Sequence, residues 1–408
     1  MGPEICRRID ELAAISEDLA CLTRIFLSHQ QRQASDLVLS WMRQAGMTAH
    51  TDAIGNVVGR YEGNLPGLPA LILGSHLDTV RDAGKYDGML GVVTAIACVD
   101  RLNCEGCRPE FAIEVIGFSD EEGVRFGTTM LGSKAVAGTF DPAVLTRVDR
   151  DGIGMDRALR DFGLDPENIS AAAHSRDAVL AYVEFHIEQG PVLEMRGIPV
   201  GCVTSISGAT RFEVEIRGQA GHAGTVPMTD RKDALAAAAE CVLAIETRCN
   251  GEPGLVGTVG RLETSPGAIN VIPGLVRFTI DLRAPDNTQR MRCADDIVEK
   301  IEQISDRRGV AQTMRKIHDM AAAPCAGWLM EQIDSSLIGE GIPAFHLPSG
   351  AGHDGMAMID LADIGMIFLR CAGGISHNPA EAISVADAEI GANVLLRFIR
   401  DFQPKAQS

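Results

Sequence analysis

The stretch Ala70–Asp78, ALILGSHLD, indicates the fold. Apolar residues follow one another without interruption and then give way abruptly to polar ones, among them His76 and Asp78. Such a run is typical of a strand that is buried on both faces, as strands of a parallel α/β sheet are. Ligands of open α/β sheets bind beyond the carboxyl ends of the strands. We therefore predict an α/β sheet with a site at this end of the strand.

Three further stretches repeat the pattern of a buried strand followed by polar residues. They are FAIEVIGFSDEEG at 111–123, AYVEFHIEQG at 181–190 and MIFLRCAGGISHNPAE at 366–381. Residues 4–28, 31–46, 88–103 and 386–402 have the periodicity of helices, and 47–63 resembles a hairpin that turns at Gly55 and Asn56. The predicted fold is an α/β domain with a mostly parallel central sheet flanked by helices.

The middle of the chain has a different pattern. TRFEVEIRG at 210–218 alternates strictly, as a half-exposed antiparallel strand does, and residues 255–264, 274–284 and 309–319 are further strands of this kind. Helices are predicted at 230–248 and 287–307. This β-α-β-β-α-β order is the split βαβ pattern. We predict that 209–324 form an inserted α+β dimerisation and lid domain, a four-stranded antiparallel sheet with two helices, between catalytic parts 1–208 and 325–408.

Composition excludes several functional classes. The 408 residues carry a formal net charge of -18 and no basic run, which argues against nucleic-acid binding and against attraction to anionic membranes. We see neither a signal peptide nor an apolar stretch long enough to span a membrane, and expect a cytoplasmic protein. The 11 cysteines do not suggest a disulfide framework, and the lone CxxC of Cys104 and Cys107 is expected to be a reduced surface turn.

Histidines and carboxylates gather at the predicted strand ends. A lone histidine is more often structural than a ligand, but three histidines together with several carboxylates at equivalent ends of different strands predict a metal centre. Imidazole and carboxylate oxygen are ligands of zinc and related divalent ions, and a carboxylate can bridge two of them. The candidates are His76, Asp78, Asp87, Glu121, Glu122, His186 and His377.

Six separated motifs resemble those of the aminoacylase/carboxypeptidase-type metallohydrolases, and more narrowly their amidase/hydantoinase/carbamoylase branch. They are GSHLDTV, DAGKYDGMLGV, SDEEGVRFG, HIEQGPVLE, GQAGHAGTVPM and ISHNPAE, in the family order from about residue 70 to 390. The branch contains allantoate amidohydrolases, N-carbamoyl-L-amino-acid hydrolases and β-alanine synthases.

The resemblance implies two divalent metal ions, Zn or Mn, with Co or Ni also accepted. The first ion would be held by His76, Asp87 and His186. The second would be held by Asp87, Glu122 and His377, so that Asp87 bridges the two. Glu121 matches the general base, which takes a proton from water and returns it to the leaving nitrogen, and Asp78 matches the residue behind His76.

The resemblance also implies a set of substrate contacts. His222 would polarise the scissile carbonyl from the partner subunit of a homodimer, and Asn270 and Arg283 would hold the substrate carboxylate. The alternatives are a surface-loop histidine for His222 and a strand-end salt bridge for Arg283. The remaining matches are Gln189, Gly352 and His353, with Arg211 a weaker candidate.

Three functions remain open at this stage. The favoured one is hydrolysis of a C–N bond in the ureido group of a small carboxylate. Allantoate, of purine catabolism, comes first, with release of ammonia, CO2 and ureidoglycine or ureidoglycolate; N-carbamoyl-L-amino acids come second. An aminoacylase or dipeptidase would cleave acyl amides instead. A non-catalytic binding protein would have lost Glu121 or a ligand, and none is missing.

Overall fold

The structure is a computed structural model, and it describes residues 1–405. Contacts divide the chain into two compact units. The first comprises Met1–Thr204, Pro324–Leu347 and the chain from His353 onward, and the second comprises Ser205–Ala323 and Pro348–Gly352. The larger segment of the second unit is thus inserted in the sequence after Thr204, and its short segment interrupts the first unit again after Leu347.

A mixed nine-stranded sheet forms the centre of the first unit. Its path is β1-β2-β4-β3-β5-β16-β6-β14, with β15 paired to β6. The four central strands, β4, β3, β5 and β16, are parallel, and β1, β2 and β6 join them in antiparallel pairs. The strands are β1 Thr48–Thr51, β2 Val57–Tyr61, β3 Ala70–His76, β4 Ala112–Phe118, β5 Val179–Ile187, β6 Val200–Ile206, β14 Ala323–Pro324, β15 His346–Ser349 and β16 Ile364–Leu369.

Every residue of β3, β4 and β16 is buried, which confirms the prediction of strands covered on both faces. The helices that cover them are α1 Gly2–Ala13, α2 His29–Gln44, α3 Met89–Cys104, α4 Leu131–Val136, α5 Met155–Asp161, α6 Val192–Arg196, α9 Gly327–Gly339, α10 Gly355–Met358 and α11 Val385–Asp401. Ser28 and Ser384 cap α2 and α11 by accepting a backbone N–H three residues on.

The predicted helix over residues 4–28 is wrong in its second half. Helix α1 ends at Ala13, and the chain then folds into turns in which Ser16 Oγ accepts the N–H groups of Asp18 and Thr23. Leu19, which had supported a longer apolar face, is fully exposed. Serine and aspartate side chains that bond nearby N–H groups offer the backbone an alternative to the helix, and here that alternative is taken.

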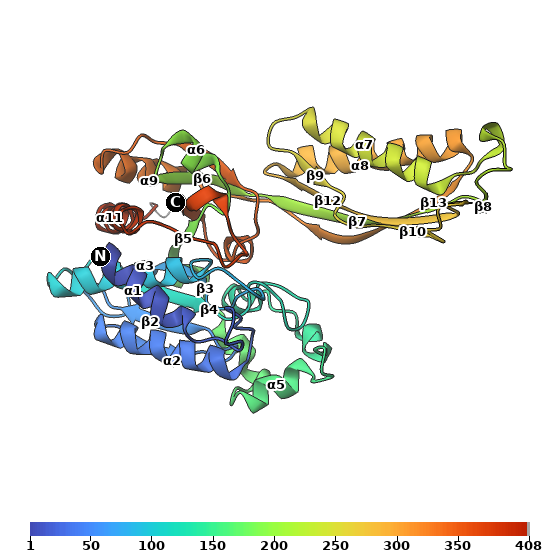
Figure 1. Ribbon diagram of the computed structural model, residues 1–408. Coiled ribbons are helices and arrows are strands. Elements are labelled where there is room, and N and C mark those ends of the chain that lie inside the picture. The colour runs from blue at the N-terminus through green and yellow to red at the C-terminus, as the bar shows by residue number, and fades with distance from the viewer. Residues whose placement is uncertain (406–408) are drawn as a thin grey trace. The chain divides into compact units, whose positions relative to one another are not determined.

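The second unit is a twisted antiparallel sheet with two helices on one face (Figure 1). Its order is β10-β12-β7-β13, with β9 also on β12, and a separate pair joins β8 to β11. The predicted strand over 255–264 is divided into β9 and β10, so the sheet has five strands rather than four. The elements are β7 Gly208–Arg217, β8 Gly221–His222, α7 Ala234–Asn250, β9 Val256–Thr258, β10 Leu262–Ser265, β11 Val271–Ile272, β12 Leu275–Ala284, α8 Asn287–Arg308 and β13 Ala311–Met320.

Alternation along the strands creates the core of this unit. On β7 the side chains of Phe212, Val214 and Ile216 are buried while those between them are partly exposed. These face the apolar stripes of α7 and α8, which include Ala237, Cys241 and Ile301. Asp233 and Asp286 cap the two helices. No helix among residues 1–405 is both long and apolar enough to cross a membrane.

Candidate metal centre and active site

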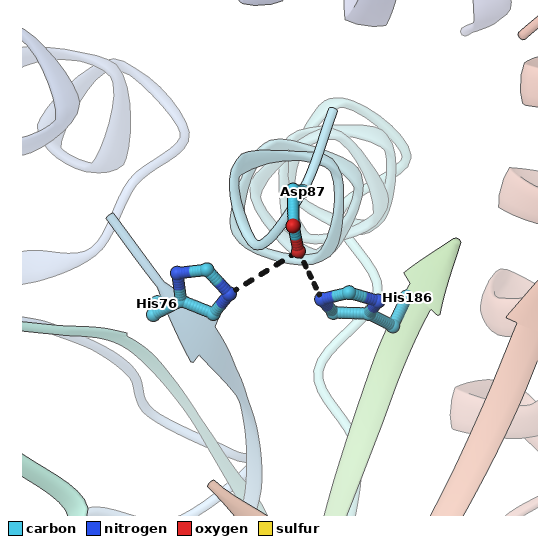
Figure 2. Close-up of side chains that lie close together, drawn as sticks. All are labelled: His76, Asp87 and His186. Atoms are coloured by element: carbon cyan, nitrogen blue, oxygen red, sulfur yellow. Dashed lines mark ion pairs between the residues drawn. The ribbon is translucent and has the colours of Figure 1, made fainter. Parts of the chain in front are cut away.

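Two groups of potential metal ligands share Asp87. In the first, Asp87 Oδ1 lies 3.5 Å from His76 Nε2 and 3.1 Å from His186 Nε2. Figure 2 shows the two rings on either side of this oxygen. In the second, Asp87 Oδ2 lies 3.1 Å from Nε2 of His377, which is 3.4 Å from Glu122 Oε1. The carboxylate of Asp87 therefore stands between two sets of donors, with one oxygen toward each.

The local backbone explains how these donors converge. His76 is the last residue of β3 and His186 the penultimate residue of the neighbouring parallel strand β5, so both lie at the same edge of the sheet. Asp87 directly precedes Gly88, the N-cap of α3, which has φ 75°. A Cβ on Gly88 would come within 2.5 Å of the His76 ring, so only glycine fits at this position.

Both buried imidazoles present Nε2 to Asp87 because Nδ1 is occupied elsewhere. His76 Nδ1 is 3.0 Å from the backbone oxygen of Asp78, and His186 Nδ1 is 2.8 Å from the backbone oxygen of Ile187. A carbonyl oxygen only accepts, so each Nδ1 carries a proton, and the neutral form of either ring has its lone pair on Nε2. This is the tautomer that a metal ligand requires, with the orienting carbonyl behind it.

Asp78 has a second contact besides its proximity to His76. The carboxylate of Asp78 is 3.7 Å from His76 Nδ1, whereas the backbone oxygen of Asp78 is 3.0 Å from the same nitrogen. The two carboxylate oxygens accept the N–H groups of Glu121 and Glu122, at 3.0 and 3.1 Å. Asp78 thus fixes the loop that carries both glutamates, and its side chain links β3 to the segment after β4.

The electrostatics of the centre favour added positive charge. Burial raises the pKa of Glu121 well above its ordinary value, and the neighbouring charge of Glu122 raises it further. Burial also opposes ionisation of Asp87, but hydrogen bonds from His186, His377 and His76 outweigh it and hold that pKa well below its ordinary value. Contacts with Asp87 and then Glu122 raise the pKa of His377 to about 10. Divalent cations bound between these groups would balance the charge of the carboxylates.

Two of the predicted residues sit in strained backbone. Gln189 has φ 58° and His377 has φ 53°, in the left-handed region that residues other than glycine rarely adopt. Gln189 Nε2 donates to Asp87 Oδ2 at 2.9 Å and to Ser376 Oγ at 3.1 Å. Strain of this kind persists only where surrounding contacts enforce it, and it is concentrated at functional sites.

His353 lies beside the centre in the first unit. Its ring centroid is 4.5 Å from that of His186, and it is fully buried. Burial, with the nearby His186, holds its pKa well below the ordinary value, so His353 is neutral and retains one N–H donor. Gly352, its neighbour in sequence, is exposed and belongs to the second unit.

The remaining predicted contacts lie in the second unit. His222 on β8 pairs with Val271 on β11, and the N–H of Ala223 donates to the backbone oxygen of Asn270 at 3.0 Å, so the structure brings His222 and Asn270 together. Arg283 donates twice to Asp281, at 3.1 and 3.2 Å, and to Gly350 O at 2.8 Å. Arg211 also pairs with Asp281 (3.1 Å). The strand-end salt bridge considered for Arg283 is therefore present.

Comparison with known proteins identifies the family. The model of peptidase family M20/M25/M40 matches residues 72–401. The chain belongs to this peptidase M20 family. It is 41% identical over 395 residues to the N-carbamoyl-L-amino acid amidohydrolase of Geobacillus stearothermophilus, covering 97% of both chains. It is also 41% identical over 422 residues to the allantoate deiminase of Arabidopsis thaliana, covering 95% of this chain and 80% of that one.

Solved structures indicate which branch of the M20 family the chain resembles. A crystal structure of an amidase of the hydantoinase/carbamoylase family from Burkholderia multivorans superimposes with a TM-score of 0.92 at 30% identity, covering 99% of both chains. The predicted α/β fold with an inserted domain and the predicted branch are confirmed. This M20-family chain is accordingly a hydrolase.

Sequence reasoning missed several acids at this M20 centre. Glu381 Oε1 accepts the N–H groups of Tyr86 and Asp87, and its Oε2 accepts Ser376 Oγ. Asp120, Glu184 and Asp354 are buried, and burial raises the pKa of each. Asp120, Glu184 and Glu381 lie inside the strand-end stretches of the sequence, and Asp354 directly follows His353. Periodicity does not reveal contacts such as that of Glu381 with Asp87, which are far apart in sequence.

Proposed function

We propose that the chain is a binuclear metal-dependent amidohydrolase that cleaves a C–N bond in the ureido group of a small carboxylate. The observation that carries the proposal is the position of Asp87, whose two oxygens face separate ligand groups. Two metal ions at about 3.5–4 Å need a ligand that reaches both, and a carboxylate placed in this way is such a ligand.

The donor chemistry fits two divalent cations. His76, Asp87 and His186 would hold one, and Asp87, Glu122 and His377 the other. Imidazole and carboxylate ligands suit Zn, Mn, Co or Ni. When bound, such ions lower the pKa of water and polarise a carbonyl oxygen.

Glu121 has the environment of a general base and acid. It is buried beside Glu122, with its pKa raised, and its backbone is held by Asp78. A carboxylate whose pKa is raised toward neutrality accepts a proton from water and gives it up again readily. Glu121 would take the proton of the attacking water and deliver it to the leaving nitrogen.

Gln189 and His353 would contact the substrate near the metals. The Oε1 atom of Gln189 is buried and has no hydrogen-bond partner among residues 1–405. A ureido group has N–H donors that such an acceptor would bind, whereas a simple acyl amide has fewer. The neutral ring of His353 would offer an N–H to a substrate oxygen.

His222, Asn270, Arg283 and Gly352 would complete the substrate site, with His222 donated by the partner subunit. The N–H of Gly224 donates to His222 Nδ1 at 3.0 Å, which leaves the proton of a neutral ring on Nε2. Nε2–H is then a donor that would stabilise negative charge on the scissile carbonyl oxygen. Arg283 would bind the substrate carboxylate through N–H groups that now contact Gly350 and Asp281. A homodimer follows from this arrangement, with His222 acting across the interface.

Allantoate is the first candidate substrate and N-carbamoyl-L-amino acids the second. Curated relatives that are named for each substrate are equally similar to this chain, at 41% identity. We place allantoate first on a resemblance of the phrases TVRDAGKYDGMLG and LPSGAGHDGMAM to those of bacterial allantoate amidohydrolases. Small differences in pocket fit separate such substrates by only a few kcal/mol.

The test measures ammonia and CO2 release from allantoate and from N-carbamoyl-L-amino acids after reconstitution with Mn or Zn. We expect turnover of allantoate that a chelator abolishes and that added metal restores. Turnover of N-carbamoyl-L-amino acids alone would select the second substrate. No turnover of either, with cleavage of acetyl-amino acids or dipeptides instead, would overturn the ureido assignment.

A further inference from the structure

A second type of ligand cluster lies in the first unit and shares no residue with the groups at Asp87. It combines the thiol of Cys202 on β6, the carboxylate of Asp334 on α9 and the imidazole of His346, the first residue of β15. The three ligand atoms lie within 4.8 Å of one another. Three separate elements therefore direct sulfur, oxygen and nitrogen donors to one point.

Backbone pairing explains why the three meet. The N–H of Cys202 donates to Phe345 O at 2.9 Å, which places His346 beside Cys202 where β15 pairs with β6. His346 Nε2 lies 3.0 and 2.9 Å from the two oxygens of Asp334. Helix α9 thus contributes its ligand to the edge at which these strands pair.

The cluster extends from the interior to the surface. Cys202 is fully buried, the side chain of Asp334 is 23% exposed and that of His346 is 44% exposed. The thiol makes a weak contact with Val203 O at 3.9 Å. An ordinary surface ion pair of His346 and Asp334 needs no sulfur behind it, whereas a metal that enters from the solvent side would reach all three.

We propose that Cys202, Asp334 and His346 form a further metal site, one that takes zinc or a similar thiophilic divalent ion. Thiolate, imidazole and carboxylate are the ligands that zinc prefers, and water would supply a fourth. In a tetrahedral zinc site neighbouring ligand atoms lie about 3.5 Å apart, so the cluster needs only a small contraction. Binding releases the proton of the Cys202 thiol to solvent. It also replaces the hydrogen bond between His346 and Asp334 with bonds from each side chain to the metal.

The site would be structural. It would join α9 to the paired strands β6 and β15, so that the bound metal stabilises this part of the fold. Burial, and then the charge of Asp334, raises the pKa of the Cys202 thiol. Metal affinity should therefore increase with pH, because the thiolate is the ligand.

Cobalt spectroscopy separates this site from the Asp87 centre. Co²⁺ bound to thiolate has a sulfur-to-cobalt charge-transfer band in the near ultraviolet, and the Asp87 groups contain no sulfur. Metal-stripped full-length protein is titrated with Co²⁺ and the band is recorded. We expect the band in the wild type and its loss in Cys202→Ser. In His346→Gln the Co²⁺ affinity read from the band should fall tenfold or more. The side chain of His346 is exposed, so this substitution should not disturb folding.

Two controls test where a band would come from. Cys104→Ser removes an exposed thiol of the CxxC and should leave the band unchanged, and so should His377→Ala, which removes a donor of the Asp87 centre. The proposal is overturned if the wild type shows no band at saturating Co²⁺, or if the band survives Cys202→Ser and disappears in Cys104→Ser. Neither result depends on catalytic activity, so the proposed function stands or falls separately.

Discussion

The oxygens of Asp87 are divided between His186 and His377: Oδ1 lies 3.1 Å from one Nε2 and Oδ2 lies 3.1 Å from the other. His186 is fully buried at the end of β5, whereas the side chain of His377 is 51% exposed. The two imidazoles therefore approach the carboxylate from the interior and from the solvent side. This division is what a bridging ligand between two cations requires.

Substitutions of the neighbours Glu121 and Glu122 should have different effects on activity and metal content. Glu121→Gln keeps the shape of the side chain but removes the base, so kcat should fall by about 10²–10⁴-fold while metal content stays normal. Glu122→Gln removes a ligand and should lower metal content as well as activity. Steady-state kinetics together with metal analysis of both variants check this. Equal loss of metal in the two variants would contradict the separate roles.

Gln189 should contribute to substrate binding through its amide oxygen. Gln189→Ala should lower kcat/KM for a ureido substrate by about tenfold, the value of one hydrogen bond of roughly 1.4 kcal/mol. Ser376→Ala is the matched control, because Ser376 Oγ also lies beside Asp87 Oδ2 (3.2 Å) but the side chain has no amide oxygen. If the two variants show the same change in KM, Gln189 acts only by holding Asp87.

His222 should act across a dimer interface. His222→Ala and Glu121→Ala subunits should each be inactive, with His222→Ala lowering kcat by about 10²–10³-fold as loss of an oxyanion donor does. When the two variants are mixed, unfolded together and refolded, partial activity should return, since each heterodimer contains one intact site. A preparation that is dimeric but regains nothing would argue against the shared site.

The ion pair of His174 and Glu114 should make stability depend on pH. The hydrogen bond to Glu114 raises the pKa of His174 above 6.5 in the folded chain. A raised histidine pKa stabilises the fold below about pH 6.5, and this contribution is lost as the pH rises through the folded value. A double-mutant cycle with His174→Gln and Glu114→Gln should give a coupling of about 1–3 kcal/mol near pH 6.

Near pH 9 the same cycle should give a coupling close to zero. Urea denaturation at both pH values measures it, and the comparison is internal because the same four proteins are used. A coupling that does not change between the two pH values would mean that His174 stays neutral and contributes through packing alone.

The positions of the strand ends could be predicted because buried runs end in polar residues, and His76, Glu122 and His186 follow from that pattern. The cluster of Cys202, Asp334 and His346 could not, since it depends on how α9 packs beside paired strands. The same holds for Glu381, which bonds Asp87 across 294 residues of sequence. The sequence did not predict the end of α1 at Ala13, because apolar residues continue at helical spacing as far as Leu19. In the structure, local hydrogen bonds of serine and aspartate side chains end the helix earlier.

Anomalous diffraction from crystals of the Mn-loaded protein tests the central claim most directly. Mn²⁺ prefers oxygen and imidazole donors, so it reports on the Asp87 centre and not on a thiolate. We predict two peaks about 3.5–4 Å apart, one beside His76 and His186 and one beside Glu122 and His377, with Asp87 contacting both. A single peak, or two peaks of which one does not contact Asp87, would contradict the binuclear centre.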